Sequence, residues 1–280
     1  MKLFSNHLYI VSTPIGNLDD MTLRAVEVLK NSDIILCEDT RRSLKLLDHY
    51  KIKKKLVSYH KFNEKKKISK IIEYFKEGKI LSLISDAGTP LLSDPGRILI
   101  KECINKKISV IPIPGVSSIT AALSISGFED KFLFYGFLPK RENELAKVLT
   151  SLSHNNYTQI FFVPSKKINF YIKAFKKFYL GRKLVIAKEI TKLHEAFIRA
   201  DIEKIKIFKS PLKGELTIVI SESAKKIKKS FDEEKIVYKA KKYLKKYSLK
   251  DSVELILETE KVNRKKVYDL CLQIKNEKNH

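Results

Sequence analysis

The chain has 280 residues, 44% of them hydrophobic, and its 56 Lys and Arg against 32 Asp and Glu give a formal charge of +24. This length suits one large domain or two compact ones, and the apolar content allows a sizeable core. No apolar run approaches the roughly 20 residues that span a bilayer, and we expect no signal peptide. The three cysteines are spaced too widely for a zinc site or a disulfide framework, so we expect a cytoplasmic protein with neither metal nor membrane partner.

The charge of +24 has two interpretations. A basic surface attracts polyanions, and nucleic acid is the commonest large polyanion in a cell. The excess is not confined to one segment, however, and Lys, Ile and Asn are abundant everywhere, which is also what compositional drift produces. The charge therefore permits an RNA partner, and both explanations stay open.

In the first half, short apolar strands alternate with helical patterns. The strands are expected at 8–11, 34–37, 56–59, 80–84 and 108–111. Each of the first four helices is expected to bury an apolar face. These faces are, in chain order, Leu23, Val26 and Leu29; Leu44, Leu47 and Tyr50; Ile68, Ile71, Ile72 and Phe75; and Ile98, Leu99 and Cys103. A fifth helix is expected at 116–126. Asp94 is expected to cap the fourth helix, with Pro95 at its first position. The alternation indicates a mainly parallel sheet with both faces covered.

In such sheets, ligands bind beyond the carboxyl ends of the strands. This rule singles out the loops 12–17, 38–42, 60–64, 85–90 and 112–118. None of them has the glycine spacing of a dinucleotide site or a P-loop, and the chain contains no H-E-x-x-H or G-x-S-x-G motif.

The loop at 85–90 is the most suggestive of the five. Ala87 and Gly88 would let its backbone approach a flat ligand closely. Its carboxylate would repel a triphosphate but tolerate a cation such as the sulfonium of S-adenosylmethionine. Asp86 either takes part in such a site or hydrogen-bonds its own turn, as aspartates in turns do.

The stretch Phe132–Pro139 is expected to form a strand that leads into the polar segment Lys140–Glu144, and we interpret this stretch as the interdomain connection. A second alternating unit follows, with strands at 159–163, 183–187 and 215–220, helices at 168–178 and 202–208, and an extra strand near 195–199. From Ala224 onward, 17 basic residues face nine acidic ones, and three short helices are expected. This tail is either a small RNA-binding unit or a helical cap. We predict domains at 1–136, 137–223 and 224–280.

Several motifs resemble, in order and spacing, the tetrapyrrole-methylase-fold enzymes, in the branch that methylates ribosomal RNA. They are Leu8–Leu18, Glu38–Arg41, His60–Glu64, Ser85–Pro90, Asp94–Gly96, Pro112–Gly115, Gly136–Pro139, Lys188–Lys192 and Lys213–Glu215. The resemblance runs from about residue 8 to residue 275. It implies two α/β domains of the tetrapyrrole methylase type, mainly parallel in the first, plus a small helical C-terminal region.

The resemblance also implies an activity. The family branch transfers a methyl group from S-adenosylmethionine to the ribose 2′-oxygen of a decoding-region cytidine in 16S rRNA, or in the small ribosomal subunit. It implies a homodimer, with the methyl donor held folded in the cleft between the two α/β domains. A small-molecule methylase of the tetrapyrrole type, or a non-catalytic RNA-binding or assembly protein, remains an alternative. The Lys-rich tail argues against the first of these.

Matching motifs assign residues to the expected sites. The donor site would use Pro14, Asp86, Ala87, Gly88, Thr89, Ser117, Ser118, Phe162, Ala187, Glu215, Leu216 and Thr217. Substrate RNA would meet Thr13, Asn17, Glu38, Asp39, Arg41, His60, Asn63, Glu64 and Lys188. A ribose hydroxyl is a poor nucleophile, so a base should help. The candidates are Glu38, Asp39, His60, Glu64, Lys188 and Glu189, and we favour the Glu38–Asp39 loop with Arg41 positioning phosphate.

The chain departs from the family pattern in its second half. At 162–167 it lacks a usual glutamate, having Val163, and it has Lys166 and Lys167 where a His-Arg pair is common. Lys188 likewise stands where arginine is usual. Lysine keeps the charge but loses the planar fork that binds an anion through two hydrogen bonds.

Overall fold

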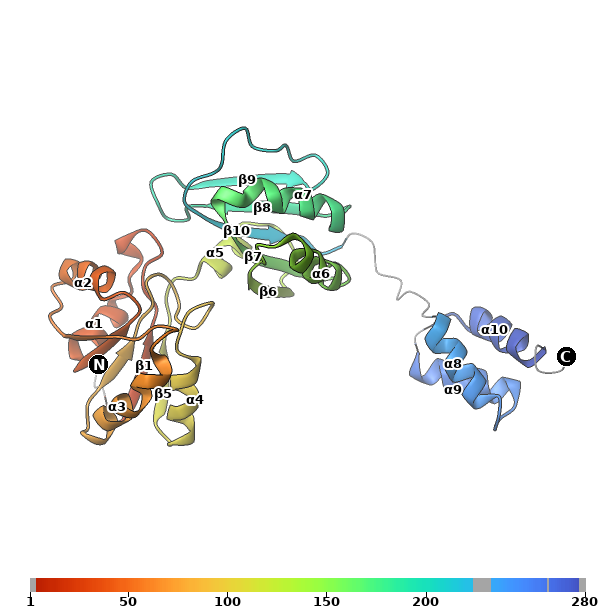
Figure 1. The fold of residues 1–280 in the computed structure, drawn as a ribbon, viewed down its shortest axis with the longest axis horizontal. Helices are drawn as coiled ribbons and strands as arrows, with labels where there is room; N and C mark the ends of the chain where they lie inside the picture. The colour runs from red at the N-terminus through yellow and green to blue at the C-terminus, as the bar shows by residue number, and fades with distance from the viewer. Residues whose placement is uncertain (1–3, 224–232, 261, 277–280) are drawn as a thin grey trace. The chain divides into compact units, whose positions relative to one another are not determined.

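The computed structural model describes residues 4–223, 233–260 and 262–276 (Figure 1). The chain forms two compact units, Met1–Glu222 and Ser223–His280. The first unit contains two five-stranded sheets, and the second is helical.

The first sheet is entirely parallel, in the order β3-β2-β4-β1-β5. Its strands are β1 (His7–Val11), β2 (Ile34–Cys37), β3 (Lys55–Ser58), β4 (Leu81–Leu83) and β5 (Ser109–Ile113). The intervening helices are α1 (Leu23–Asn31), α2 (Thr40–His49), α3 (Glu64–Lys76) and α4 (Arg97–Asn105). One core layer lies between the sheet and α3 and α4, and another between the sheet and α1 and α2. The predicted parallel sheet with two covered faces is confirmed.

This strand order positions the site. β1 lies between β4 and β5, with Leu8 paired to Leu81 on one side and to Val110 on the other. Because the three strands are parallel, the loops that follow them leave the same edge of the sheet. The loops at 12–17, 84–96 and 114–117 therefore meet.

The second sheet is mixed, in the order β6-β7-β10-β8-β9, and only its β6–β7 pair is parallel. Its strands are β6 (Phe132–Phe137), β7 (Thr158–Pro164), β8 (Lys183–Lys188), β9 (Ala196–Asp201) and β10 (Glu215–Ile220). One face packs on α6 (Glu142–Ser153) and α7 (Ile168–Phe178), while the other packs on α5 (Ser118–Ser124). Although α5 follows the last strand of the first sheet, its buried Ile119 and Ala122 contact the second sheet.

Three details of the sequence prediction are wrong. Residues 202–208 form no helix: Lys204 and Ile205 donate only one turn's hydrogen bonds to the Asp201 carbonyl, at 3.0 and 3.1 Å, and an extended segment follows. The spacing of the buried Ile202 and Ile205 imitated a helical face. Two leucines expected to be buried are exposed: Leu44 of α2 is 51% exposed, and Leu23 is 90% exposed because α1 buries Ala25, Val28 and Leu29. At about 100° per residue, the middle of that stripe lies opposite Leu23.

The third error concerns the start of α4. Its N-cap is Gly96, at φ +129°, and no side chain caps the helix. Asp94 and Pro95 therefore precede the helix in a loop. The 132–138 segment also differs from its interpretation as a connection, since β6 pairs with β7 inside the second sheet. The predicted boundary between residues 136 and 137 passes through this strand.

The helical unit consists of α8 (Glu233–Tyr243), α9 (Leu249–Thr259) and α10 (Arg264–Asn276). The three helices share a core of Ile236, Ala240, Val253, Ile256, Val267, Cys271 and Ile274. The Ser248 hydroxyl caps α9 by accepting from the Asp251 N–H at 3.2 Å. The three predicted helices are present, and they pack on a core of their own.

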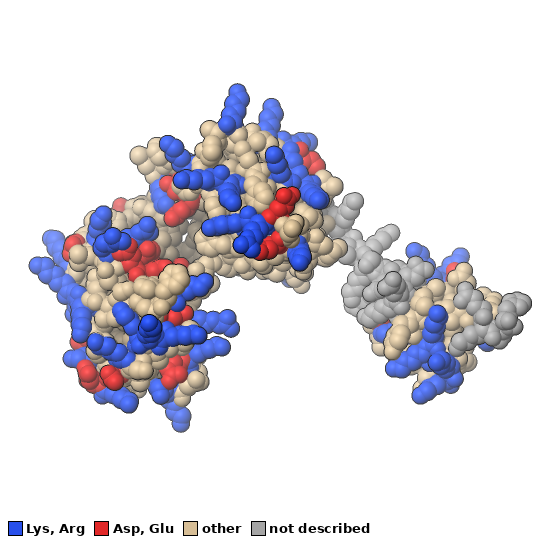
Figure 2. Space-filling view, viewed as in Figure 1, with Lys and Arg blue, Asp and Glu red and all other residues tan. Residues whose placement is uncertain are grey.

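Within the described residues, no helix is both long enough and apolar enough to cross a bilayer. Lys and Arg side chains lie over every part of the visible face of the first unit, with acidic side chains between them (Figure 2). On this face the basic excess does not gather into one patch.

Candidate functional site

A pocket of about 500 Å³ opens in the first unit, and residues from both sheets line it. The loops of the first sheet contribute Ile15, Ala87, Gly88, Thr89, Leu92, Ser93, Asp94, Ser117, Ser118 and Ile119. The second sheet and its loops contribute Phe137, Phe162, Val163, Pro164, Ser165, Lys166, Ala187, Ile190, Gly214, Glu215, Leu216 and Thr217. Ten of the twelve residues predicted for the donor site lie in this wall, all except Pro14 and Asp86.

Gly88 fixes the floor of the pocket. Its N–H donates to the Thr13 carbonyl at 3.0 Å and its carbonyl accepts from the Thr13 N–H at 2.9 Å. The Thr13 hydroxyl also donates to the Ser85 carbonyl at 3.2 Å. Gly88 has φ +77°, which a side chain would strain, and a Cβ there would stand 3.2 Å from Ile15 Cγ2. The floor is therefore rigid and open to close approach by a ligand.

A second set of contacts ties this floor to the loop after β5. The Thr89 hydroxyl donates to the Val116 carbonyl at 3.1 Å and lies 3.0 Å from the Ser12 hydroxyl. Gly115 packs against Ser12 so closely that a Cβ would stand 2.8 Å from the Ser12 Cβ. The three loops that meet at this edge of the sheet thus form one hydrogen-bonded structure.

The opposite wall comes from three neighbouring strands of the second sheet. Thr217 of β10 pairs with Phe162 on one side and with Ala187 on the other. Cross-strand partners point to the same face of a sheet, so these three side chains form one continuous surface. Apart from the Thr217 hydroxyl, this three-residue surface is apolar, as suits a flat ring that needs few polar contacts.

Loop 189–195 of the second sheet touches the first sheet's 12–17 loop. The Asn17 N–H donates to the Thr191 hydroxyl at 3.1 Å. A Cβ on Gly16 would stand 2.3 Å from Lys192 Cγ and 2.8 Å from Thr191 Oγ1. This contact joins the two walls of the pocket at one end.

We expect Gly16→Ala to weaken ligand binding in the pocket by about 5–10-fold, because loop 189–195 must move to admit the methyl group. Isothermal titration calorimetry with S-adenosylmethionine measures the effect. Lys192→Ala removes the Cγ that is in the way, so the double variant should bind better than additivity predicts. Additive losses would show that the contact does not shape the pocket.

Glu189 organises the same loop from inside. Its carboxylate accepts from the Glu215 N–H at 2.8 Å and from Lys192 Nζ at 3.1 Å, and Lys192 Nζ also lies 3.0 Å from Glu215 Oε2. Burial raises the pKa of Glu189, but these hydrogen bonds outweigh burial and leave it below its ordinary value. Glu189 is therefore an anion engaged in structure, and a weak candidate for the base.

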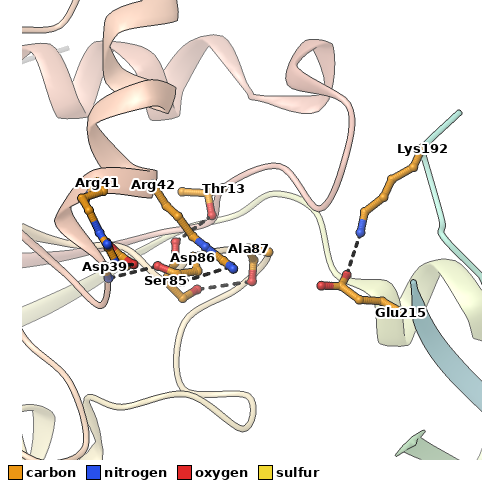
Figure 3. Close-up of polar contacts among 9 residues, drawn as sticks. All are labelled: Thr13, Asp39, Arg41, Arg42, Ser85, Asp86, Ala87, Lys192 and Glu215. Atoms are coloured by element: carbon orange, nitrogen blue, oxygen red, sulfur yellow. Dashed lines mark hydrogen bonds and ion pairs between the residues drawn. The ribbon is translucent and has the colours of Figure 1, made fainter. Parts of the chain in front are cut away.

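The Asp86 side chain points toward Asp39 and Arg42 (Figure 3), and Asp86 is not among the residues that line the pocket. Its carboxylate accepts from the Asp39 N–H at 3.1 Å and pairs with Arg42 at 3.3 Å. The predicted alternatives for Asp86 were a ligand contact or a bond to its own turn. The contact observed is a third kind, a brace between the loops that follow β4 and β2.

Asp39 is the N-cap of α2. Its side chain accepts from the Arg41 N–H at 2.9 Å and pairs with the Arg41 guanidinium at 3.0 Å. The hydrogen bonds from Arg41 lower the pKa of Asp39 to about 2. Burial, followed by repulsion from Asp86, raises the pKa of the neighbouring Glu38. The two carboxylates therefore differ: the pKa of Asp39 lies below its ordinary value and the pKa of Glu38 lies above it.

Three of the other predicted RNA contacts, His60, Asn63 and Glu64, lie around the loop after β3. The His60 N–H donates to Asn63 Oδ1 at 2.9 Å, and His60 Nε2 lies 3.0 Å from Asn63 Nδ2. Glu64 Oε2 accepts from the Gly96 N–H at 3.3 Å. Lys188, at the end of β8, donates to the His194 carbonyl at 3.2 Å. The structure places none of these four in the pocket wall.

Sequence reasoning missed several residues of the wall. The sequence pattern does not place Leu92, Ser93 and Asp94 in the wall, because Asp94-Pro95 resembles the start of a helix. Phe137 was assigned to a linker. The unusual clustering of glycine, proline and aspartate in 85–96 is the sequence feature that could have indicated that the whole segment contributes to the pocket. Among the described residues, no three His, Cys, Asp or Glu side chains form a group that could hold a metal ion.

Residues 7–206 match the family of Tetrapyrrole (Corrin/Porphyrin) Methylases. The chain is 44% identical to Ribosomal RNA small subunit methyltransferase I of Thermotoga maritima, over 76% of this chain and 97% of that one. It is 40% identical to the protein of that name from Buchnera aphidicola, over 95% and 96% of the two chains.

Solved structures agree on the fold. A diphthine synthase aligns with a TM-score of 0.59 at 15% identity, covering 76% of this chain and 89% of that one. A uroporphyrin-III C-methyltransferase from Thermus thermophilus, complexed with S-adenyl homocysteine, aligns with a TM-score of 0.55 at 16% identity, covering 77% and 97%. With a shared fold, and 40% identity along nearly the whole chain, this protein belongs to the ribosomal RNA small subunit methyltransferase I family of the tetrapyrrole methylases.

Proposed function

We propose that this protein transfers a methyl group from S-adenosylmethionine to the ribose 2′-oxygen of a cytidine in the decoding region of 16S rRNA. The observation that carries the proposal is the 40% identity to the ribosomal RNA small subunit methyltransferase I of Buchnera aphidicola. That alignment covers 95% of this chain, so it extends into the basic helical unit. The solved structures of a uroporphyrin-III C-methyltransferase and a cobalt precorrin-4 methyltransferase align at 17–18% identity, far below the 40–44% of the ribosomal RNA methyltransferases.

The pocket suits the donor. Its volume of about 500 Å³ lies in the usual range of small-molecule sites. The bare floor at Gly88 and the wall of Phe162, Ala187 and Thr217 would hold the adenine, and the hydroxyls of Ser117, Ser118 and Thr217 are available to its polar groups. When bound, S-adenosylmethionine supplies an electrophilic methyl carbon on a sulfur that leaves neutral. The protein therefore needs no acid for the leaving group.

The work left to the chain is alignment of the ribose hydroxyl and removal of its proton. The Asp86 carboxylate connects the loop after β2 to the loop that forms the pocket floor. The loop after β2 therefore lies beside the floor, where the RNA can reach it. Arg41 is well placed for a phosphate because its side chain is 88% exposed. Asp39, with a pKa of about 2, is a poor base, and its role is to hold Arg41 and cap α2.

We also propose an oligomeric state, a cellular location and a division into functional regions for this enzyme. The enzyme would act as a homodimer in the cytoplasm, where its RNA is. The divisions at 1–136, 137–223 and 224–280 are proposed as functional regions, with the donor cleft shared by the first two and the basic helical unit contributing RNA affinity.

The decisive experiment is mass mapping of 16S rRNA from cells that lack the protein. We expect one cytidine to lose 14 mass units (one methylene) and its resistance to alkaline hydrolysis, and purified enzyme with the donor to restore both on RNA or isolated small subunits. An unchanged map would contradict the proposal. Methylation of a tetrapyrrole instead would support the small-molecule alternative. Tight RNA binding without donor binding would indicate an assembly protein.

A further inference from the structure

Phe62 is 90% exposed, more than any other phenylalanine or tyrosine of the described residues. It lies in the loop after β3, and it is not one of the RNA contacts that the family motifs predict. Single apolar side chains are common on protein surfaces, so exposure alone gives Phe62 no role. Its neighbours and its place in the fold distinguish it.

A closed turn after β3 holds Phe62 away from the body of the protein. The N–H groups of Asn63 and Glu64 donate to the His60 carbonyl at 2.9 and 3.0 Å, and the His60 N–H donates to Asn63 Oδ1 at 2.9 Å. The Phe62 N–H donates to His60 Nδ1 at 3.3 Å, and the centroids of the two rings lie 6.1 Å apart. Because these bonds already fix the turn, little conformational entropy is lost when Phe62 contacts a ligand.

The turn lies at the edge of the first sheet where the pocket floor lies. β3 is parallel to β2, and β2 to β4, so the loops after these strands leave the sheet at one edge. Glu64 Oε2 accepts from the Gly96 N–H at 3.3 Å, and Gly96 follows the wall residue Asp94 by two positions. β3 is two strands from β4, which is about 10 Å at the usual strand spacing. A substrate longer than one nucleotide can therefore extend from the pocket to Phe62.

Positively charged side chains surround Phe62 at this edge. Lys61 and Lys65 flank it in the sequence and are exposed. Arg41 and Arg42 lie in the first turn of α2, after the neighbouring strand, and although both pair with aspartates their side chains stay 88% and 70% exposed. Cations bind the phosphates of a single-stranded nucleic acid, and an aromatic ring among them stacks on its bases. The core of a protein–protein interface is poor in lysine, so RNA fits this edge better than a second protein.

We propose that Phe62 binds the substrate RNA by stacking on an unpaired base beside the methylated nucleotide, an inference that rests on the proposed function. RNA is recognised mostly at single-stranded segments, whose bases are free to stack on aromatic side chains. The stacked base holds the adjoining ribose over the pocket, and Lys61 and Lys65 bind the phosphates near it. Every base has a flat face, so this contact contributes affinity and alignment rather than base identity.

The test compares Phe62→Ala with Leu180→Ala, a similar truncation at a 67% exposed side chain in the turn between α7 and β8. Methylation of isolated small subunits from cells that lack the protein gives KM and kcat, and calorimetry gives donor affinity. We expect Phe62→Ala to raise KM about 5–100-fold, as for one lost stacked base, with kcat and donor affinity within about threefold of wild type. Leu180→Ala should change none of the three.

Further substitutions at Phe62 distinguish stacking from apolar bulk. Phe62→Tyr keeps a flat ring and should keep the wild-type KM, whereas Phe62→Leu keeps an apolar side chain without a flat face and should behave like Phe62→Ala. The chain contains no tryptophan, so Phe62→Trp introduces a single fluorescent indole. Single-stranded RNA with the decoding-region sequence should quench this indole to saturation, because it stacks on a base. The indole of Leu180→Trp should not be quenched.

The possible results distinguish this inference from the proposed function. Wild-type enzyme that methylates no small subunits overturns the proposed function. Active wild type with an equally active Phe62→Ala variant overturns the inference alone, as does a Phe62→Leu variant with the wild-type KM or an indole at position 62 that stays unquenched when RNA is bound. If Phe62→Ala changes the sedimentation of the protein and leaves KM unchanged, Phe62 lies between copies of this chain, and the inference is likewise overturned.

Discussion

Gly88→Val is expected to abolish donor binding, with an affinity loss of about 100-fold or more, which corresponds to roughly 2.7 kcal/mol. The substitution has two effects. A valine at φ +77° is strained, and its side chain would occupy the pocket floor beside Ile15, 3.2 Å from the new Cβ. Calorimetry with S-adenosylmethionine measures the loss directly.

The chain supplies a matched control for this prediction. Gly78 has φ +75°, and no heavy atom lies within 4 Å of the point where a Cβ would stand. Gly78→Val thus carries the same backbone strain, about 1–2 kcal/mol, without entering the pocket. Both variants should lose similar thermal stability, and only Gly88→Val should lose the donor. Equal donor affinity in the two would show that Gly88 does not face the ligand.

Arg182→Ala is expected to destabilise the first unit by about 3–5 kcal/mol. Arg182 is 3% exposed, and its guanidinium donates to the carbonyls of Ser221, Ser153 and Asn155 at 3.2, 2.8 and 2.7 Å. Truncation leaves these carbonyls without their donor, and each buried unsatisfied group costs about 1–3 kcal/mol. Urea denaturation, followed by circular dichroism, measures the change.

Arg199→Ala is the matched control for this second prediction. Arg199 donates to one carbonyl, that of Ile125, at 2.8 Å, and its side chain reaches solvent. Its loss should cost less than about 1 kcal/mol. Arg182→Lys should lower the free energy of unfolding by an amount between those of Arg182→Ala and Arg199→Ala, because an ammonium cannot reproduce the planar fork that reaches three acceptors. A small effect of Arg182→Ala would mean that water replaces the guanidinium.

The sequence predicts the first half well because parallel strands buried on both faces are short apolar runs, and here each run is bounded by turn residues and followed by a helical pattern. The prediction fails where one local sequence pattern is compatible with two different backbone structures. Ile202 and Ile205 are spaced as on a helix, yet a single turn after β9 buries both. Asp94-Pro95 has the chemistry of a cap, yet packing of Leu91 and Gly96 sets the helix start later. Tertiary contacts decide such cases, and a local pattern contains no information about them.

The site shows the same division. Gly88 lies in a loop that follows a predicted strand, so its place at the carboxyl edge of the sheet could be anticipated from topology. Thr217 lies within strand β10, and its place in the pocket was implied by the family resemblance. The orientation of Asp86 could not be anticipated, because it depends on Arg42 and on the Asp39 N–H, which another strand brings near. Which sheet β6 joins was equally hidden, since an apolar strand pairs as well on either side of a connection.

The placement of α5 bears on how the first unit can be divided. Ile119 and Ala122 are buried against β8 and β10, although the helix is continuous with the chain of the first sheet. A fragment ending at residue 136 would carry this helix without its partner strands, together with most of β6, and would expose both. The two halves therefore depend on each other to fold, as complementary fragments do. If they are produced separately, we expect neither to be soluble alone and the pair to recover structure when mixed.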